Sequence, residues 1–191
     1  MKTAKVIAAT AAVLAASLWS TAYAQSCNTC GSPEVTAPKQ GRHSAGDTSA
    51  DGVVWPPNHK FRTMRLSNSV NEQGDSCDIN ITGVRQDEAT NAIGSGGPKH
   101  CPDAQNINNT SSTSTAVDLR GERAGTNGED ETAGGMGTGR YYHVQYDLTD
   151  PDCPMPKSGE ALLLVPHDQG VAHLNSWVDE GPLFDSTACT P

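Results

Sequence analysis

The sequence predicts an all-β protein, a disulfide-stabilised β-sandwich with long polar loops. Short runs alternate apolar and polar residues, as half-buried strands do, and glycine, proline, asparagine and aspartate separate these runs. After the first 24 residues, no stretch repeats its apolar side chains with the period of a helix. Several short strands divided by turns are typical of two sheets packed face to face.

The first 24 residues have the features of a secretory signal. Lys2 and Lys5 precede an apolar run that is too short to span a bilayer, and Ala22-Tyr23-Ala24 supplies a cleavage site of small residues. We therefore expect a secreted or periplasmic protein. The chain divides into a signal peptide (1–24), a polar N-terminal tail (25–52) and a β-sandwich domain that includes a C-terminal tail (53–191).

The charge of the chain limits its partners. It has 13 basic and 22 acidic residues, and removal of the two lysines of the signal leaves 11 basic against 22 acidic residues, a net charge of −11. Such an acidic surface disfavours nucleic acids and anionic membranes as partners and is compatible with cations. No second apolar segment is long enough for a membrane span.

Six cysteines remain after cleavage, and in an oxidising compartment an even number predicts three disulfides. The alternative for Cys27-Asn28-Thr29-Cys30, a redox or zinc motif, is disfavoured because no second pair has similar spacing and the segment lies in a polar tail. We predict that Cys77 pairs with Cys153, and that Cys189 pairs with Cys27 or Cys30. Cys101 then takes the remaining cysteine of the first pair.

The packed domain is expected to begin with a rigid corner. Pro56 and Pro57 fix their own φ angles and restrict the residues before them, so the chain passes this point in one direction. Trp55 has the largest apolar surface of any side chain and is predicted to enter the core. Polar residues, Asn58 to Lys60, follow directly after.

Five strands are expected after this corner, at residues 60–66, 77–84, 117–120, 140–150 and 161–165. The strand 140–150 has the clearest alternation, and 151–159 is taken as its connection to 161–165. Two long loops separate the strands. Residues 94–115 require a clamp, which Cys101 supplies, and the glycine-rich residues 122–139 are predicted to be mobile.

Six short motifs in this order resemble a bacterial secreted immunoglobulin-like β-sandwich module, over about residues 53–185. The motifs are Trp55-Pro56-Pro57-Asn58-His59-Lys60, Ile81-Thr82-Gly83-Val84-Arg85-Gln86-Asp87-Glu88, Pro102-Asp103-Ala104, Leu119-Arg120-Gly121-Glu122-Arg123-Ala124-Gly125, Gly139-Arg140-Tyr141-Tyr142 and Val165-Pro166-His167-Asp168. The resemblance implies an immunoglobulin-like antiparallel sandwich and an extracellular setting. It implies no particular chemistry.

The chain departs from this family in two places. Family members commonly carry a Gly-Asp-Gly-Asp run suited to a hard cation, whereas Gly94-Ser95-Gly96-Gly97 lacks both carboxylates. The segment between Gly125 and Gly139 is also expanded and contains Glu129-Asp130-Glu131, a run that is more often solvated charge than a cation site.

Acidic residues at turns and strand ends are the candidate metal ligands. Calcium takes six to eight oxygen ligands, and a sandwich could bring together five carboxylates, those of Asp87, Glu88, Asp103, Glu122 and Asp168. The competing interpretation is ion pairing on neighbouring strands with the arginines Arg85, Arg120, Arg123 and Arg140. Ion pairing is favoured, and calcium is kept as the candidate cofactor.

Other chemistry has less support. Four histidines, His59, His143, His167 and His173, are candidates for copper or zinc, but their spacing does not resemble a ligand pair. No nucleophile elbow, His-Glu-x-x-His motif or phosphate loop is present, so no catalytic residue is assigned.

The sequence therefore predicts a non-catalytic exported module that acts in binding or structure at the cell surface or outside the cell, with calcium as the candidate cation. Its partner is an unidentified protein or glycan. The alternatives are a glycan-binding accessory part of a secreted enzyme system and a histidine-based metal-binding exported protein. Glycan binding would need a planar set of exposed aromatic residues, and a sandwich core requires several of the few that remain.

Overall fold

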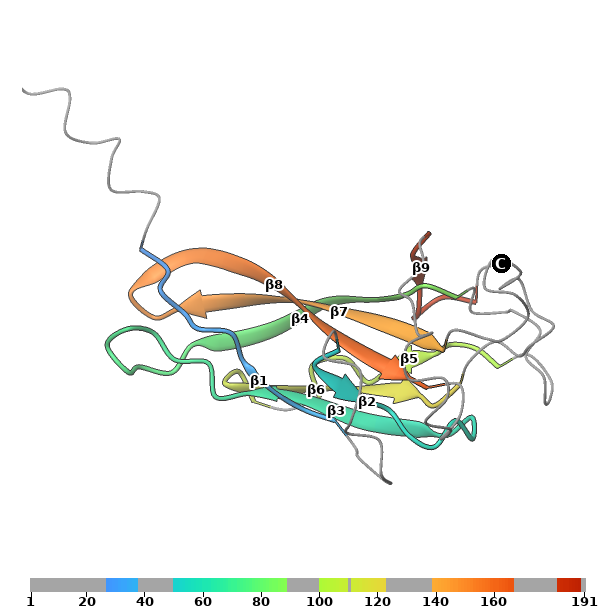
Figure 1. The fold of residues 1–191 in the computed structure, drawn as a ribbon. Helices are drawn as coiled ribbons and strands as arrows, with labels where there is room; N and C mark the ends of the chain where they lie inside the picture. Colours follow the sequence, from blue (N-terminus) through green and yellow to red (C-terminus); the bar gives the residue numbers. More distant parts are fainter. Residues whose placement is uncertain are drawn as a thin grey trace, which may run out of the picture.

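Two β-sheets face each other, and their inner sides form the core (Figure 1). The computed structural model describes residues 27–37, 50–88, 100–109, 111–122, 139–166 and 182–189. The four-stranded sheet has the order β1 (Glu34–Thr36), β3 (Phe61–Ser67), β6 (Ser114–Arg120) and β5 (Ala104–Gln105). The five-stranded sheet has the order β2 (Gly52–Val53), β8 (Cys153–Val165), β7 (Arg140–Asp150), β4 (Asp78–Gln86) and β9 (Phe184–Asp185).

The prediction of an all-β fold is confirmed, and one pairing in it is parallel. β2 runs parallel to the C-terminal part of β8, with Gly52 opposite Leu163 and Val53 opposite Leu164. The other strand pairs are antiparallel. The expectation of a purely antiparallel sandwich was therefore too strict. No helix in the described residues is long and apolar enough to cross a membrane.

The inward side chains of β4 and β7 show how the pattern produces the core. The predicted inward side chains of β7, those of Tyr142, Val144, Tyr146 and Leu148, are all buried in the core, and on the other face of the strand His143 is buried as well. In β4 a register shift between Ile81 and Gly83 moves the alternation by one residue, so Val84 faces the core.

The strand β8 is much longer than the predicted strand 161–165. It begins at Cys153, and only a short turn separates it from β7, so the predicted connection 151–159 is wrong. The first part of this strand was not predicted because it contains Pro154, Pro156 and Gly159. Proline and glycine normally indicate the end of a strand. Prolines are tolerated where a strand lies at a sheet edge, and the described neighbour β2 pairs only with the far end of β8.

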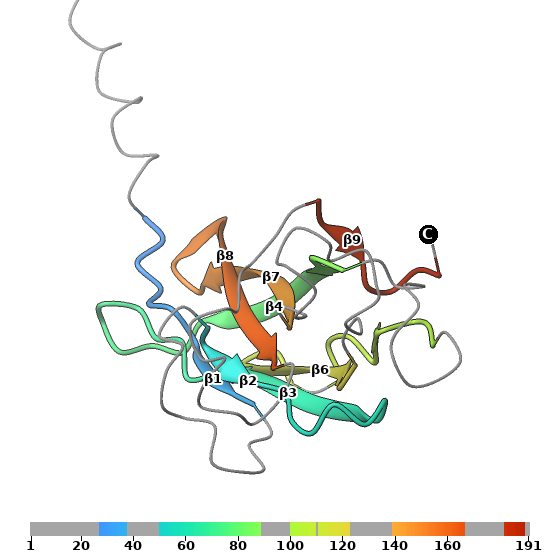
Figure 2. The same ribbon diagram turned by 45° about the vertical axis from the view of Figure 1, so that its right-hand side comes forward.

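The segment 27–37, assigned from the sequence to a polar tail, belongs to the folded domain. Its strand β1 pairs with β3 at the edge of the four-stranded sheet. Figures 1 and 2 both show β1 close to β2, and a Cβ atom on Gly52 would approach the Cβ of Ala37 to 2.7 Å. The chain is too tightly packed there for a larger residue at position 52.

Three disulfides are present, as predicted, but each predicted pairing is wrong. The bridges are Cys27–Cys153, Cys30–Cys77 and Cys101–Cys189. The prediction failed because it treated the first two cysteines as part of a free tail, whereas the N-terminal segment is folded against the β3–β4 loop and the β7–β8 turn. Cys101 does clamp its long loop, as expected.

The corner at Trp55 places a different residue in the core. Val54 is fully buried, whereas Trp55 is only partly buried. After the prolines, His59 adopts a positive φ of 62°, and its N–H donates to the Gly121 carbonyl at 2.8 Å. The corner is thus held by its backbone against the end of β6.

The outer edge of β4 is covered by three short segments in place of a long strand. The Ile79 N–H donates to the Ser112 carbonyl, and the Asn108 side chain both accepts the Ile81 N–H (2.7 Å) and donates to the Ile81 carbonyl (2.9 Å). Asn108 also accepts a hydrogen bond from the Thr115 hydroxyl of β6, so it joins the two sheets. The end of β4 is covered by residues 182–189, the C-terminal strap, which contains β9 (Figure 2).

Candidate functional site

Charged side chains from four strand ends meet at one end of the sandwich, which we call the arginine end. It comprises the five residues Glu88, Asp103, Arg120, Glu122 and Arg140. β4 ends where β7 begins, and β6 ends beside the start of β5, so antiparallel pairing brings these positions together. The cluster follows directly from the topology.

Arg140 is the most enclosed member of the arginine end, with 2% of its side chain exposed. Its Nε atom donates to Glu88 Oε2 at 2.9 Å, and one terminal nitrogen donates to Asp103 Oδ2 at 2.7 Å. Burial by itself lowers the pKa of Arg140, but Tyr142, Glu88 and Asp103 raise it, and the net direction is upward. The guanidinium therefore stays charged between two carboxylates.

Arg120 contacts the same buried carboxylate from the other side. Its Nε atom lies 3.3 Å from Asp103 Oδ1 and 3.7 Å from Glu122 Oε2. Its terminal nitrogens donate to the carbonyls of His59 (3.0 Å) and Pro102 (2.9 Å). The guanidinium carbon also lies 4.2 Å from the centre of the Phe61 ring, a cation–π contact.

Neutral polar groups complete the network around Asp103. The amide nitrogen of Gln86, a fully buried residue, donates to Asp103 Oδ2 at 2.8 Å and to the Glu88 carbonyl at 2.8 Å. The Tyr142 hydroxyl donates to the Arg120 carbonyl at 2.8 Å. Burial raises the pKa of Tyr142, so this hydroxyl remains a donor.

Two imidazoles lie at the rim of the arginine end. The Nδ1 atom of His59 is 3.4 Å from Glu122 Oε2, and neither atom has a hydrogen bond of good geometry. The rings of His59 and His100 are 4.9 Å apart, centre to centre. His100 was not among the candidate histidines because nothing in its sequence neighbourhood marks it.

The structure brings together three of the five predicted metal ligands and pairs them with arginines. Glu88, Asp103 and Glu122 lie in the arginine end. Asp87 points elsewhere and accepts the Tyr141 N–H at 2.8 Å, and Asp168 lies outside the described residues. Across the part of the chain that the structure describes, no group of three or more His, Cys, Asp or Glu side chains is placed to hold a metal ion.

Of the four arginines predicted to pair with these carboxylates, the structure places two in the arginine end. Arg120 and Arg140 pair with carboxylates as expected, whereas Arg85 lies near Asp185 and Arg123 is outside the described residues.

Among the other candidate histidines, His143 pairs with Glu160 at 3.1 Å, and His167 and His173 are not described. Tyr142 and Gln86 were missed as members of the cluster. The two-residue period of β7 could have revealed Tyr142, because it shares a strand face with Arg140.

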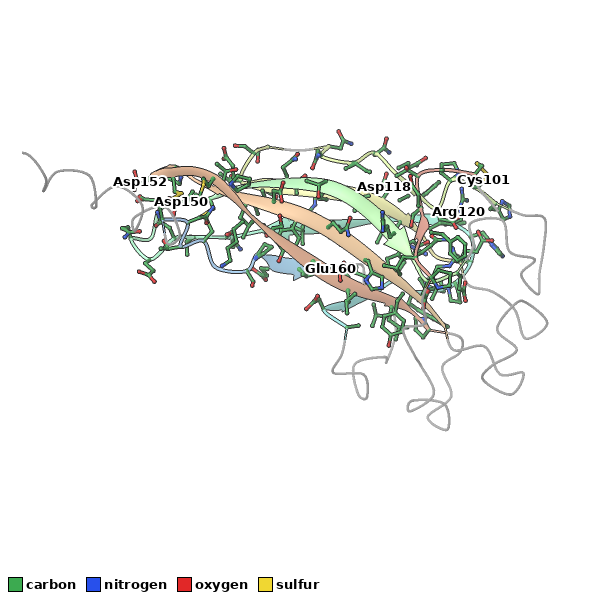
Figure 3. The ribbon with its side chains drawn as sticks, turned by 90° about the horizontal axis from the view of Figure 1, so that it is seen from above. Cys101, Asp118, Arg120, Asp150, Asp152 and Glu160 are labelled. Carbon is green, nitrogen blue, oxygen red and sulfur yellow. A yellow bond between two sulfur atoms is a disulfide. The ribbon has the colours of Figure 1, made fainter. Side chains whose placement is uncertain are left out.

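The opposite end of the sandwich, which we call the disulfide end, has one organising carboxylate (Figure 3). Asp150 accepts hydrogen bonds from the N–H groups of Thr29 and Asp152 and from the Asn71 side chain, at 3.0 to 3.2 Å. The Asp152 N–H does most to lower the pKa of Asp150, against the opposing effect of burial. The disulfides Cys27–Cys153 and Cys30–Cys77 lie beside it.

Comparison with known proteins gives no relative for this chain. No family model matches it, and neither the curated proteins nor the solved structures contain a match.

Proposed function

We propose that the protein is an exported, non-catalytic binding and structural module with an immunoglobulin-like β-sandwich, acting at the cell surface or outside the cell. Three disulfides in one domain are typical of proteins that fold in an oxidising compartment. The signal features of the first 24 residues support the same setting. The acidic surface favours neutral or basic partners.

The observation that carries the proposal is the position of Arg140. Its guanidinium occupies the space between Glu88 and Asp103, where a cation shared by these carboxylates would otherwise lie. A charge-assisted pair of this kind orders the strand ends that carry it. We therefore assign the cluster a scaffolding role, in which arginine replaces the calcium considered from the sequence.

The arrangement of the motifs supports the family resemblance. The six motifs are scattered over more than a hundred residues, yet residues of five of them meet at the arginine end: Arg120 contacts both His59 and Pro102, and Arg140 reaches Asp103 and Glu88. Motifs that form one structural unit are what a shared fold requires. A chance set of short matches has no reason to converge.

Calcium dependence provides the first test. The mature protein, purified without chelator, is analysed for bound metal and then unfolded thermally in calcium and in EDTA. We expect less than one metal ion per chain and the same unfolding midpoint in both solutions, because Arg140 and Arg120 supply the positive charge. Stoichiometric calcium, or a midpoint that rises by several degrees in calcium, would overturn the scaffolding role.

Binding is tested separately with the same material. Immobilised protein is screened against glycan arrays and extracellular polymers, and the recovered ligand is examined by mass spectrometry. Saturable binding with an unchanged ligand supports a binding module. A ligand that is cleaved or modified during the incubation contradicts the non-catalytic assignment.

A further inference from the structure

The C-terminal strap, residues 182–189, joins the two sheets at the arginine end through one residue. The Ser186 carbonyl accepts the N–H groups of Asp103 (2.8 Å) and Ala104 (2.9 Å), on the side of the four-stranded sheet. The Ser186 N–H donates to the Val84 carbonyl of β4 at 3.0 Å. The strap thus covers both the start of β5 and the end of β4.

Non-covalent contacts hold this strap only weakly. Its strand β9 pairs with two residues of β4, and Phe184, its aromatic residue, is only partly buried. The hydroxyl of Ser186 and the side-chain carbonyl of Gln86 are buried without a hydrogen-bond partner. The Ser186 hydroxyl belongs to the strap itself, so its burial without a partner disfavours the closed state.

The covalent tie of the strap is the bridge between Cys101 and Cys189. Cys189 is exposed and Cys101 is partly exposed, whereas Cys30 and Cys77 are both fully buried. In the third bridge, Cys27 is exposed but Cys153 is fully buried. Because thiol exchange requires access of the attacking thiolate to a sulfur atom, Cys101–Cys189 is the most open of the three bridges.

We propose that Cys101–Cys189 is a thiol-sensitive clasp whose reduction opens the C-terminal strap while the rest of the sandwich stays folded. A dithiol reductant transfers two electrons to the S–S bond and becomes a disulfide. Its two protons end on the thiols of Cys101 and Cys189. The freed strap leaves the Asp103 and Ala104 N–H groups and the Val84 carbonyl open to solvent, so the module presents different backbone groups in its two redox states.

The first experiment titrates the native protein with dithiothreitol, traps free thiols by alkylation and identifies them by peptide mapping. Cys101 and Cys189 should be alkylated at lower reductant concentration than the other four cysteines. At that point, amide hydrogen exchange measured by NMR should accelerate at least tenfold for Asp103 and Ala104 and stay unchanged in the β7–β8 hairpin. Earlier reduction of either other bridge overturns the proposal, as does retained protection of these two amides.

Paired variants separate the clasp from a general loss of structure. Cys101→Ser with Cys189→Ser should show the same fast exchange at Asp103 and Ala104 without reductant. The matched control, Cys27→Ser with Cys153→Ser, should leave both amides protected. Fast exchange in the control and the test variant alike would show that the strap opens with the whole fold. If either variant does not fold, the reductant titration of the native protein decides.

Discussion

The two ends of the sandwich are held together in different ways (Figure 3). At the arginine end, three carboxylates and two guanidinium groups are paired away from water. At the disulfide end, two covalent bridges and one hydrogen-bonded aspartate join segments that are distant in the sequence. The difference follows from what each end must hold. The arginine end joins the ends of three long, well-packed strands, β4, β6 and β7, to the start of the short strand β5. The disulfide end must anchor the segment 27–33, which has few apolar side chains to bury.

The comparison is tested most strongly by removing the longest bridge. Cys27→Ser with Cys153→Ser opens a loop with a sequence separation of 126 residues. In the chain-entropy model this should lower the free energy of unfolding by about 5 kcal/mol, against about 4 kcal/mol for Cys30→Ser with Cys77→Ser. Urea denaturation measures both. A larger loss for the second pair would show that local packing, and not loop length, sets the stability of this end.

The matching test at the arginine end is Arg140→Met. It leaves Asp103 and Glu88 without their shared partner in a buried site, and we expect a loss of about 4 kcal/mol in the free energy of unfolding. The exposed Arg65→Met is the control and should stay within about 0.5 kcal/mol. Adding Asp103→Asn should restore part of the loss. An Arg140 variant as stable as the control would show that the cluster is solvated.

These two ends differ in how much the sequence predicted. The ion pairs of Arg120 and Arg140 were expected, because charged residues at the ends of alternating strands meet when the strands pair antiparallel. The disulfide pairing was predicted incorrectly. Spacing along the chain does not show that residues 27–30 fold back, because their contacts are hydrogen bonds from Asn28 and Thr29 to the β7–β8 hairpin.

Two further errors had local causes. The β8 strand was shortened because the prolines near its start obscured an edge strand. Trp55 was placed in the core on size alone, whereas the neighbouring Val54 is the residue that the backbone turns inward. Residue type predicts a preference for burial, but the direction of the chain at a corner decides which of two neighbours is buried.

A smaller effect is expected where the corner contacts the end of β6. A Cβ atom on Gly121 would lie 2.6 Å from the Pro56 carbonyl oxygen, and backbone cannot move aside as a side chain can. Gly121→Ala should therefore lower the free energy of unfolding by about 2 kcal/mol. Gly83→Ala is the control, because its Cβ would meet only the movable end of Gln145, at 3.2 Å. Equal losses of unfolding free energy in the two variants would show that the backbone at Pro56 can shift to accommodate the added methyl group.

The smallest effect concerns acid. The folded state lowers the pKa of Asp150, so its contribution to stability is complete above the ordinary aspartate pKa of about 3.9 and is lost as the pH falls through the lowered value. Urea midpoints measured on acidification should fall across this window. Asp150→Asn should show a shallower dependence in the same window. Parallel profiles for the two proteins would assign the acid sensitivity to other carboxylates, such as Asp185, whose pKa is also lowered.

The disulfides also determine how far the domain can be stretched. Under tension between Cys27 and Cys189, the shortest covalent path passes through Cys30–Cys77 and Cys101–Cys189, so it contains only the chain from Cys27 to Cys30 and from Cys77 to Cys101. This path has about 27 residues and extends to roughly 95 Å, whereas the chain without bridges would extend to roughly 560 Å. An oxidised module pulled from its two ends is therefore a short tether, and opening the Cys101–Cys189 clasp would lengthen it only slightly, because Cys27–Cys153 then leaves about 36 residues between Cys153 and Cys189.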